Sequence, residues 1–270
     1  MYVYCAIYIF HKNIMRGTYK SEVNVIVSIS GFWNIINQIR KLIDNSTKCK
    51  YWLVENYLLH KEEKEKFVFH FEIYKPTLTG HLTDTSLNPL KKDEENKNVQ
   101  HKSTIYLMSK GGSIENAKRI MLAGNCILNI GGYEIGIVTA GITHNKKTWK
   151  KFIEKDRLMD YIFAFVVTIQ NNKEDFYFTC GMHNLGYPDV VVPDYLDYDQ
   201  GNYLAKAFAY YLVKYNPILL SGDKFRIDKN SPNIYRLTYE KCHIYDNFDK
   251  KIYWLCHNPY GLWRLTESII

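Results

Sequence analysis

Residues 181–193 read Gly-Met-His-Asn-Leu-Gly-Tyr-Pro-Asp-Val-Val-Val-Pro and are the most distinctive stretch of this 270-residue chain. Glycines flank a polar turn, and a run of valines follows it. We expect Gly186 to adopt a positive φ angle and Pro188 to fix the next turn. The stretch therefore predicts that one strand ends near residue 180 and that the chain enters another strand at Val190–Val192.

Three polar residues of this turn are candidate binding residues: His183, Asn184 and Asp189. We expect their side chains to project from a constrained loop, because rigid loops often hold binding groups. The alternative is that the segment is only a connection that redirects the chain into the next strand. The residues by themselves leave both interpretations open.

The segment that begins near residue 104 predicts a strand, a helix and a second strand. Thr104–Met108 is short and apolar, and Ser113 is placed to cap a helix that runs to about Leu128. Gly131-Gly132 supplies the left-handed conformation that closes a helix, and Tyr133–Thr139 has the composition of a strand. This order favours a right-handed crossover between two paired parallel strands.

Hydrophobic periodicity and composition place further elements along the chain. Strands are predicted at Val3–Phe10, Glu22–Ser30, Phe67–Tyr74, Tyr161–Gln170, Asp175–Cys180, Asn233–Tyr239 and Lys251–Leu255. Helices are predicted at Phe32–Ile43, Lys146–Lys155 and Gln200–Asn216. The segments Tyr161–Gln170 and Asp175–Cys180 should pair as an antiparallel hairpin. Together these elements predict an α/β or α+β fold, with a mixed β-sheet and helices packed on it.

The composition changes between residues 76 and 102, where Thr, Asn, Pro, Gly and charged residues predominate. We interpret residues 76–102 as a linker or mobile loop. It separates an N-terminal α/β part, residues 1–75, from a C-terminal α/β domain, residues 103–270. One continuous domain fits the same sequence.

The net charge of +7 falls short of the strongly basic character of a typical nucleic-acid-binding domain. Lys61–Lys66 alternates in sign and predicts a solvated face. Lys146–Lys151 forms a basic helical patch, which leaves a nucleic-acid binder as one alternative function.

The 6 cysteines show no disulfide-framework spacing, and a chain of this length needs none. We predict that they are reduced. The apolar start Met1–Phe10 lacks a basic region and a cleavage site, and it is too short to span a bilayer. These features predict a cytoplasmic protein that does not associate with a membrane.

No complete catalytic, cofactor or metal-binding motif is present in the sequence. The turn at Gly111-Gly112 lacks the rest of a phosphate-binding loop, and the Cys-His pairs lack zinc spacing. We therefore predict no cofactor and no metal. Cys180, His183 and Asp189 are close in sequence, which leaves a hydrolase-type enzyme that uses the Gly181–Asp189 loop as a second alternative.

Aromatic residues are abundant, with 23 Tyr, 13 Phe and 5 Trp. Tyr and Trp dominate the energetics of protein interfaces, so Tyr210 and Tyr211 of the predicted 200–216 helix are further binding candidates. Trp263 and Arg264, near the end of the chain, complete the set; we expect Trp263 to pack in the core and Arg264 to pair with an acid.

The Gly181–Asp189 segment, with the predicted helices at Gly111–Gly132 and Gln200–Asn216, resembles a bacterial domain family of unknown function. That family shows a Gly-(Met/Leu)-x-x-(Leu/Phe)-Gly-x-Pro-(Asp/Glu) stretch before an α-helix. The resemblance covers roughly residues 104–265. It implies a bacterial origin and residence in the cytoplasm, and it assigns no catalytic residue.

The leading functional hypothesis is a non-catalytic protein that binds another protein. A specific version is a cytoplasmic immunity protein that neutralises a bacterial toxin. The absence of a catalytic motif and the wealth of Tyr and Trp favour this hypothesis over the hydrolase and the nucleic-acid binder.

Overall fold

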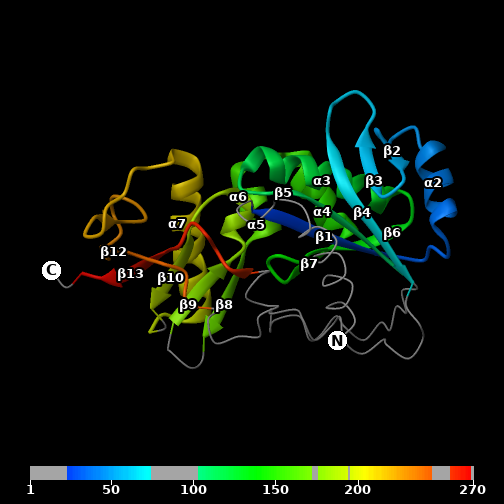
Figure 1. Ribbon diagram of the computed structural model, residues 1–270. Coiled ribbons are helices and arrows are strands. Elements are labelled where there is room, and N and C mark those ends of the chain that lie inside the picture. The colour runs from blue at the N-terminus through cyan, green and yellow to red at the C-terminus, as the bar shows by residue number, and fades with distance from the viewer. Residues whose placement is uncertain (1–22, 74–102, 172–175, 194, 245–255, 269–270) are drawn as a thin grey trace.

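The computed structural model describes residues 23–73, 103–171, 176–193, 195–244 and 256–268. Two β-sheets lie next to each other along the molecule, and helices cover one side of each (Figure 1). The combination of a mixed sheet with packed helices confirms the predicted fold class in its α+β form.

The first sheet has 7 strands in the order β2-β3-β4-β5-β1-β6-β7, and neighbouring strands in it are antiparallel. Its strands are β1 (Asn24–Gly31), β2 (Tyr51–Val54), β3 (Tyr57–His60), β4 (Lys66–Ile73), β5 (Ser103–Lys110), β6 (Gly132–Ile137) and β7 (Ile142–Asn145). The predicted strands at residues 22–30, 67–74, 104–108 and 133–139 are confirmed within this sheet.

Strand β1 is buried between its neighbours and has apolar side chains on both faces. Val25, Val27 and Ile29 point into the main core, and Ile26 points to a smaller cluster on the opposite face with Met108. The face with Ile26 also carries Ser28 and Ser30, so β1 presents its fully apolar face to the main core and a mixed face to the other side, which is typical of an antiparallel sheet.

The predicted parallel pair is wrong, because β1 separates the two strands in question. β5 and β6 run in the same direction, but each pairs with β1 in antiparallel register. The crossover helix α3 (Ile114–Asn129) therefore connects strands on either side of β1 in a split β-α-β arrangement. The local order of elements does not reveal a strand that comes from 70 or more residues earlier.

The second sheet has 6 strands in the order β11-β12-β13-β10-β9-β8. They are β8 (Val167–Asn171), β9 (Phe176–Cys180), β10 (Asp189–Pro193), β11 (Lys224–Phe225), β12 (Tyr235–Glu240) and β13 (Leu262–Glu267). Only the β10–β13 pair is parallel among the described pairings of this sheet. The predicted β8–β9 hairpin is confirmed as an antiparallel pair.

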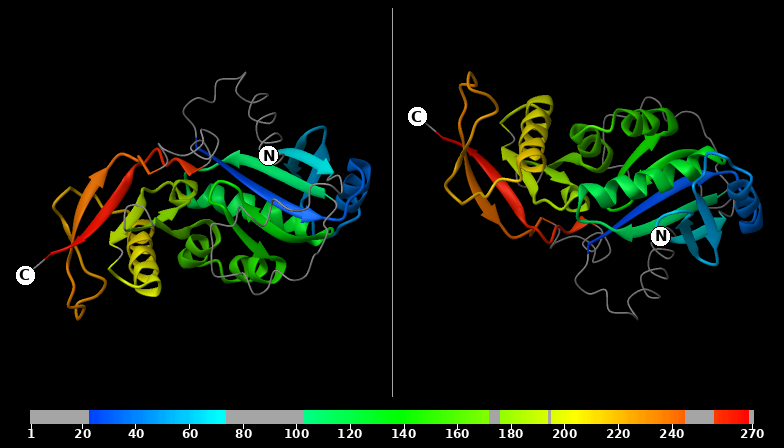
Figure 2. Two further views of the ribbon diagram at one scale, coloured as in Figure 1. Left: turned by 90° about the horizontal axis from the view of Figure 1, so that it is seen from below. Right: turned by 90° about the horizontal axis from the view of Figure 1, so that it is seen from above.

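The helices form one layer over the two sheets (Figure 2). They are α2 (Ile36–Asp44), α3, α4 (Lys146–Lys155), α5 (Leu158–Phe165), the short α6 (Met182–Leu185) and α7 (Tyr198–Tyr215). Ser113 caps α3 as predicted, since its Oγ accepts the N–H of Asn116 at 3.1 Å. The predicted lysine-rich helix is confirmed as α4, and the predicted helix at residues 200–216 is confirmed as α7.

The strand predicted at Tyr161–Gln170 is a helix in its first half, because α5 ends at Phe165 and β8 begins at Val167. Asp156 closes α4 in the left-handed conformation, and Arg157 then starts α5. The carboxylate of Asp160 accepts the Arg157 N–H at 3.2 Å, which satisfies a donor at the start of the new helix. A short, continuous apolar run does not distinguish a buried helix from a strand.

Strands from both sides of the predicted linker belong to one sheet, since β5 lies between β1 and β4. The main hydrophobic core likewise draws on both halves, with Val27 from β1, Leu107 from β5 and Val190 from β10. The predicted linker at residues 76–102 and the strands predicted at Val3–Phe10 and Lys251–Leu255 lie outside the described residues.

The structure contradicts the prediction of reduced cysteines for one pair, because Cys49 and Cys126 form a disulfide. It ties the connection between α2 and β2 to α3, across a sequence separation of 77 residues. Spacing along the chain gave no sign of a pairing that depends on α3 lying beside this connection. Cys180, Cys242 and Cys256 are buried thiols, and no helix in the described ranges is long and apolar enough to cross a membrane.

Reduction of the disulfide should lower the free energy of unfolding by about 2–4 kcal/mol, because the crosslink restricts the unfolded chain. Urea denaturation with and without a reductant measures the change. In the double variant Cys49→Ser with Cys126→Ser the reductant should have no effect, and equal stability of the oxidised and reduced wild type would contradict the prediction.

Candidate functional site

The distinctive turn at residues 181–189 contains a single helical turn, α6, enclosed by glycines in the left-handed region. Gly181 has a φ angle of 113° and Gly186 has one of 90°, so the predicted positive φ at Gly186 is confirmed. β9 ends at Cys180 and β10 begins at Asp189, so the chain leaves one strand and enters its neighbour as predicted.

Both glycines are also required by the close approach of other backbone segments. A Cβ atom on Gly186 would lie 2.4 Å from the carbonyl oxygen of Gly112, and one on Gly181 would lie 2.0 Å from that of Phe165. Gly112 and Phe165 belong to the start of α3 and the end of α5. The turn is therefore pressed against both helices, and a side chain at either position would push them apart.

His183, Asn184 and Asp189 do not project from the loop as predicted; all three are buried. His183 and Asn184 lie in the buried helical turn α6, and Asp189 is the first residue of β10. The sequence identified the right residues as unusual but placed them on the wrong side of the loop.

Asp189 is the acceptor of a buried hydrogen-bond network. Its Oδ1 accepts the Thr179 hydroxyl at 2.9 Å and the Met182 N–H at 3.3 Å, and its Oδ2 accepts the Asn258 amide at 2.8 Å. The same Asn258 amide donates to the carbonyl oxygen of Tyr187 at 2.9 Å. One carboxylate thus fixes β9, α6 and the segment that leads into β13.

Asn184 connects this network to the first sheet. Its Oδ1 accepts the hydroxyl of Thr139, which follows β6, at 2.8 Å, and its backbone carbonyl accepts the Gly112 N–H at 3.1 Å. The Gly112 amide is consequently occupied, and Ser113 caps α3 beside it. The Gly111-Gly112 turn is thus a contact between helices, which agrees with its incomplete phosphate-binding motif.

His183 is buried without a hydrogen-bond partner for either ring nitrogen among the described residues. Burial, together with the smaller effect of the nearby His257, lowers the pKa of His183 to about 4. Burial raises the pKa of Asp189 to about 7, although its three donors oppose that rise. His183 is therefore neutral near pH 7, and the side chain of Asp189 is occupied by Thr179, Met182 and Asn258.

The remaining binding candidates take separate positions. Trp263 packs in the main core as predicted, and the Arg264 guanidinium pairs with Glu240, the Nε lying 2.7 Å from its Oε1. Tyr211 is half-buried against Phe225, with ring centroids 5.4 Å apart. Tyr210 is half-buried against the main core, and the Lys214 ammonium lies 5.4 Å from the centre of its ring.

The basic patch at Lys146–Lys151 is partly structural. The Lys146 ammonium donates to the Leu128 carbonyl at 2.6 Å and so satisfies an acceptor at the end of α3. Lys150 forms an ion pair with Glu154 at 3.5 Å. Lys147 and Lys151 remain exposed on α4.

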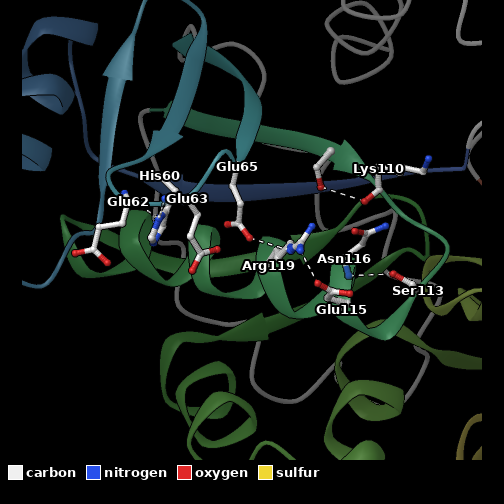
Figure 3. Close-up of polar contacts among 10 residues, drawn as sticks. His60, Glu62, Glu63, Glu65, Lys110, Ser113, Glu115, Asn116 and Arg119 are labelled. Carbon is white, nitrogen blue, oxygen red and sulfur yellow. Dashed lines mark hydrogen bonds and ion pairs between the residues drawn. The ribbon is translucent and has the colours of Figure 1, made fainter.

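A second polar cluster, which the sequence did not predict, joins the β3–β4 turn to α3 (Figure 3). The Arg119 guanidinium lies between Glu65, 2.9 Å from its Nε, and Glu115 one turn earlier on α3. Burial raises the pKa of Glu65, and neighbouring Glu63 adds to the rise. Glu65 thus departs from the solvated face predicted for Lys61–Lys66, and its distance from Arg119 in sequence explains why no local signal revealed the contact.

Within the described ranges, no group of three or more His, Cys, Asp or Glu side chains is arranged to hold a metal ion. No protein-family model, curated protein or solved structure matches this chain. The resemblance to a bacterial family therefore remains a hypothesis that rests on the motif at residues 181–189.

Replacing Gly186 by Ala should destabilise the protein by about 3 kcal/mol or more, because a left-handed backbone and a clash with Gly112 act together. Gly222 provides a matched control: its φ is 105°, but the nearest atom to an added Cβ is 3.9 Å away. Gly222→Ala should cost only about 1 kcal/mol. Urea denaturation of both variants makes the comparison, and equal losses would show that the contact with Gly112 is unimportant.

His183 and Asp189 should have opposite effects on stability between about pH 4 and pH 7. The raised pKa of Asp189, 3.8 to about 7, means that its contribution is full below pH 4 and is lost as pH rises to 7. The lowered pKa of His183, 6.5 to about 4, means that its contribution is present above pH 6.5 and is lost as pH falls to 4. At about 1.4 kcal/mol per pH unit, the contribution of Asp189 is roughly 4–5 kcal/mol and that of His183 roughly 3–4 kcal/mol, so they largely cancel.

Single variants should reveal how each of the two residues contributes to the pH dependence of stability. In His183→Leu the stability should fall as pH rises from 4 to 7, and in Asp189→Asn it should rise from pH 4 to 6.5. His183→Leu should retain the fold, because the ring nitrogens form no hydrogen bond to any described residue that the substitution would remove. Urea denaturation at several pH values gives the profiles, with exposed His243→Leu as the control; parallel profiles for all proteins would refute the assignment.

Proposed function

We propose that this protein is a non-catalytic binding protein for another protein, in its specific version an immunity protein that neutralises a toxin. The main support for the proposal is an apolar prominence, which consists of exposed side chains at the end of α7 and in the loop that follows it. Tyr215, Ile218 and Leu220 are exposed by 61%, 96% and 69%. Large aliphatic and aromatic side chains held together in solvent are typical of protein interaction sites.

The backbone of this prominence, the α7 loop (residues 216–223), is fixed to β12. The Gly222 N–H donates to the Leu237 carbonyl at 2.8 Å, and the Leu237 N–H donates to the Asp223 carbonyl at 2.8 Å. The Asp223 carboxylate accepts the Leu220 N–H at 2.8 Å, while half-buried Leu219 packs on the main core. A loop ordered before binding loses little conformational entropy when a partner docks.

The polar residues of the 181–189 turn support the same proposal because they are buried and do not form an exposed catalytic group. Asp189, Asn184 and His183 are buried, and Asp189 and Asn184 form hydrogen bonds with the protein's own groups. The hydrolase alternative needs a base that contacts a nucleophile and an orienting acid. His183 makes no hydrogen bond to a described residue, so no contact in the described structure favours that alternative.

The proposal keeps the cytoplasmic location that the sequence predicts. The Cys49–Cys126 disulfide is the observation that opposes it, because cytosolic thiols are usually kept reduced. Both cysteines are buried, so the pair is shielded from soluble reductants in the folded protein.

The test of this proposal is recovery of the partner from the native host together with the phenotype of a deletion strain. The tagged protein should retain a protein toxin through stringent washing, and the deletion strain should become more sensitive to that toxin. Retention of no protein, combined with unchanged toxin sensitivity after deletion, would sink the proposal.

A further inference from the structure

We infer that the α7 loop docks into an apolar pocket with a rim of carboxylates on the partner protein. The inference rests on the proposed function and adds the chemistry of the partner surface. α7 and β12, which hold the loop, lie side by side at the end of the molecule opposite α2 (Figure 2). The charges around the exposed Ile218 and Leu220 indicate which kind of partner surface binds the loop.

Cations of β11 and β12 face solvent beside the loop. Lys224 and Arg236 are directly opposite each other in the β11–β12 pair, and both are exposed. Their neighbours Phe225 and Tyr235 are buried, so the two cationic side chains share the outer face. Like charges directly opposite in a sheet are destabilising, and an anionic partner would relieve that repulsion.

The same cations border the apolar residues. The Arg236 guanidinium is the nearest group to the open side of Gly222, at 3.9 Å from an ideal Cβ position. On the other side, the Lys214 ammonium lies 5.0 Å from the centre of the Tyr215 ring. Among the described residues, no carboxylate forms an ion pair with Lys214, Lys224 or Arg236.

The carboxylate of the nearby Asp223 accepts the Leu220 N–H within the loop and keeps its negative charge, so it offsets only one of the three cations Lys214, Lys224 and Arg236. An apolar centre with a cationic border therefore faces solvent. The complementary surface is an apolar pocket with an anionic border, since opposite potentials across an interface favour association and correct orientation.

A lipid bilayer is a weaker match, because the loop offers too few apolar carbons for membrane binding. Ile218 and Leu220 together offer about eight side-chain carbons, whereas even a fourteen-carbon myristoyl chain gives only marginal membrane binding. A protein pocket also contacts the flanking Tyr215, which adds aromatic area to the two aliphatic side chains.

Two other occupants are disfavoured by the same residues. A second copy of this chain docked by the same loop would bring Lys224 and Arg236 against identical cations. Nucleic acid would find only Tyr215 for stacking, because Ile218 and Leu220, the more exposed side chains of the prominence, provide no aromatic surface.

Photocrosslinking in the native host tests the inference on the full chain. A photoreactive phenylalanine derivative replaces Leu220 in one protein and Trp52 in another; Trp52 is exposed on β2 and serves as the control position. The adduct at position 220 should be a protein segment in which Asp and Glu flank apolar residues, as identified by mass spectrometry.

Charge reversal provides the quantitative part. Arg236→Glu should lower the yield of the position-220 adduct about tenfold or more, because it turns attraction into repulsion. The same variant should unfold at an equal or higher urea concentration, since it removes the repulsion with Lys224. Lys147→Glu, an equivalent change on exposed α4, should leave the yield unchanged.

The outcomes separate the inference from the proposed function. Adducts at position 52 alone would leave the protein-binding function standing and overturn the inference. Adducts from position 220 to a neutral or basic segment, to nucleic acid or to a second copy would also overturn it, as would sedimentation of the purified protein with phosphatidylserine-containing vesicles. Protein adducts at neither position would remove both.

Discussion

The contact between the backbones of Gly112 and Gly186 is the constraint on which the arrangement of the two sheets depends. It brings the start of α3, which covers the first sheet, against the turn that joins β9 to β10 of the second. The backbone carbonyl of Asn184 accepts the Gly112 N–H at this contact, and the Asp189 carboxylate accepts the Met182 N–H within the turn. A side chain at Gly186 would separate these groups, whereas a Cβ atom at Gly112 would lie 2.7 Å from the Tyr260 hydroxyl oxygen.

Buried polar groups favour this arrangement, because any other arrangement would leave them without hydrogen-bond partners and lower the stability of the fold. An apolar interface tolerates small shifts, whereas a buried carboxylate that loses its donors has a large desolvation penalty. Asp189, with donors from Thr179, Met182 and Asn258, therefore specifies one way to connect β9, β10 and the segment before β13. The most distinctive residues of the sequence are thus explained by the architecture, and the proposed binding function lies elsewhere on the molecule.

The α7 loop shows the opposite distribution of residues. Backbone groups of the loop bond to β12, and its apolar side chains face solvent beside cations that form no ion pair with a carboxylate of the described residues. Apolar exposure does not stabilise the isolated chain, so a partner that covers Ile218 and Leu220 gives these residues a physical role. The same chain therefore has a polar interior junction and an apolar exterior prominence, and the two have different functions.

The sequence by itself determined the elements whose signals are local. Alternating Phe residues specified β4, Ser113 specified the start of α3, and the tyrosine-rich amphipathic segment specified α7. Positive φ at Gly186 followed from glycine between two strands, because few other residues adopt it.

Tertiary structure decided what depends on distant segments. The insertion of β1 between β5 and β6 and the Cys49–Cys126 disulfide both join residues that are far apart in sequence. Packing also decided that His183 and Asp189 are buried and do not face solvent. The helix at Leu158–Phe165 was missed because a short apolar run fits both a strand and a helix until its neighbours fix the choice. Local chemistry sets the conformation of segments with strong local signals, whereas packing decides the ambiguous ones and determines which groups meet and which face solvent.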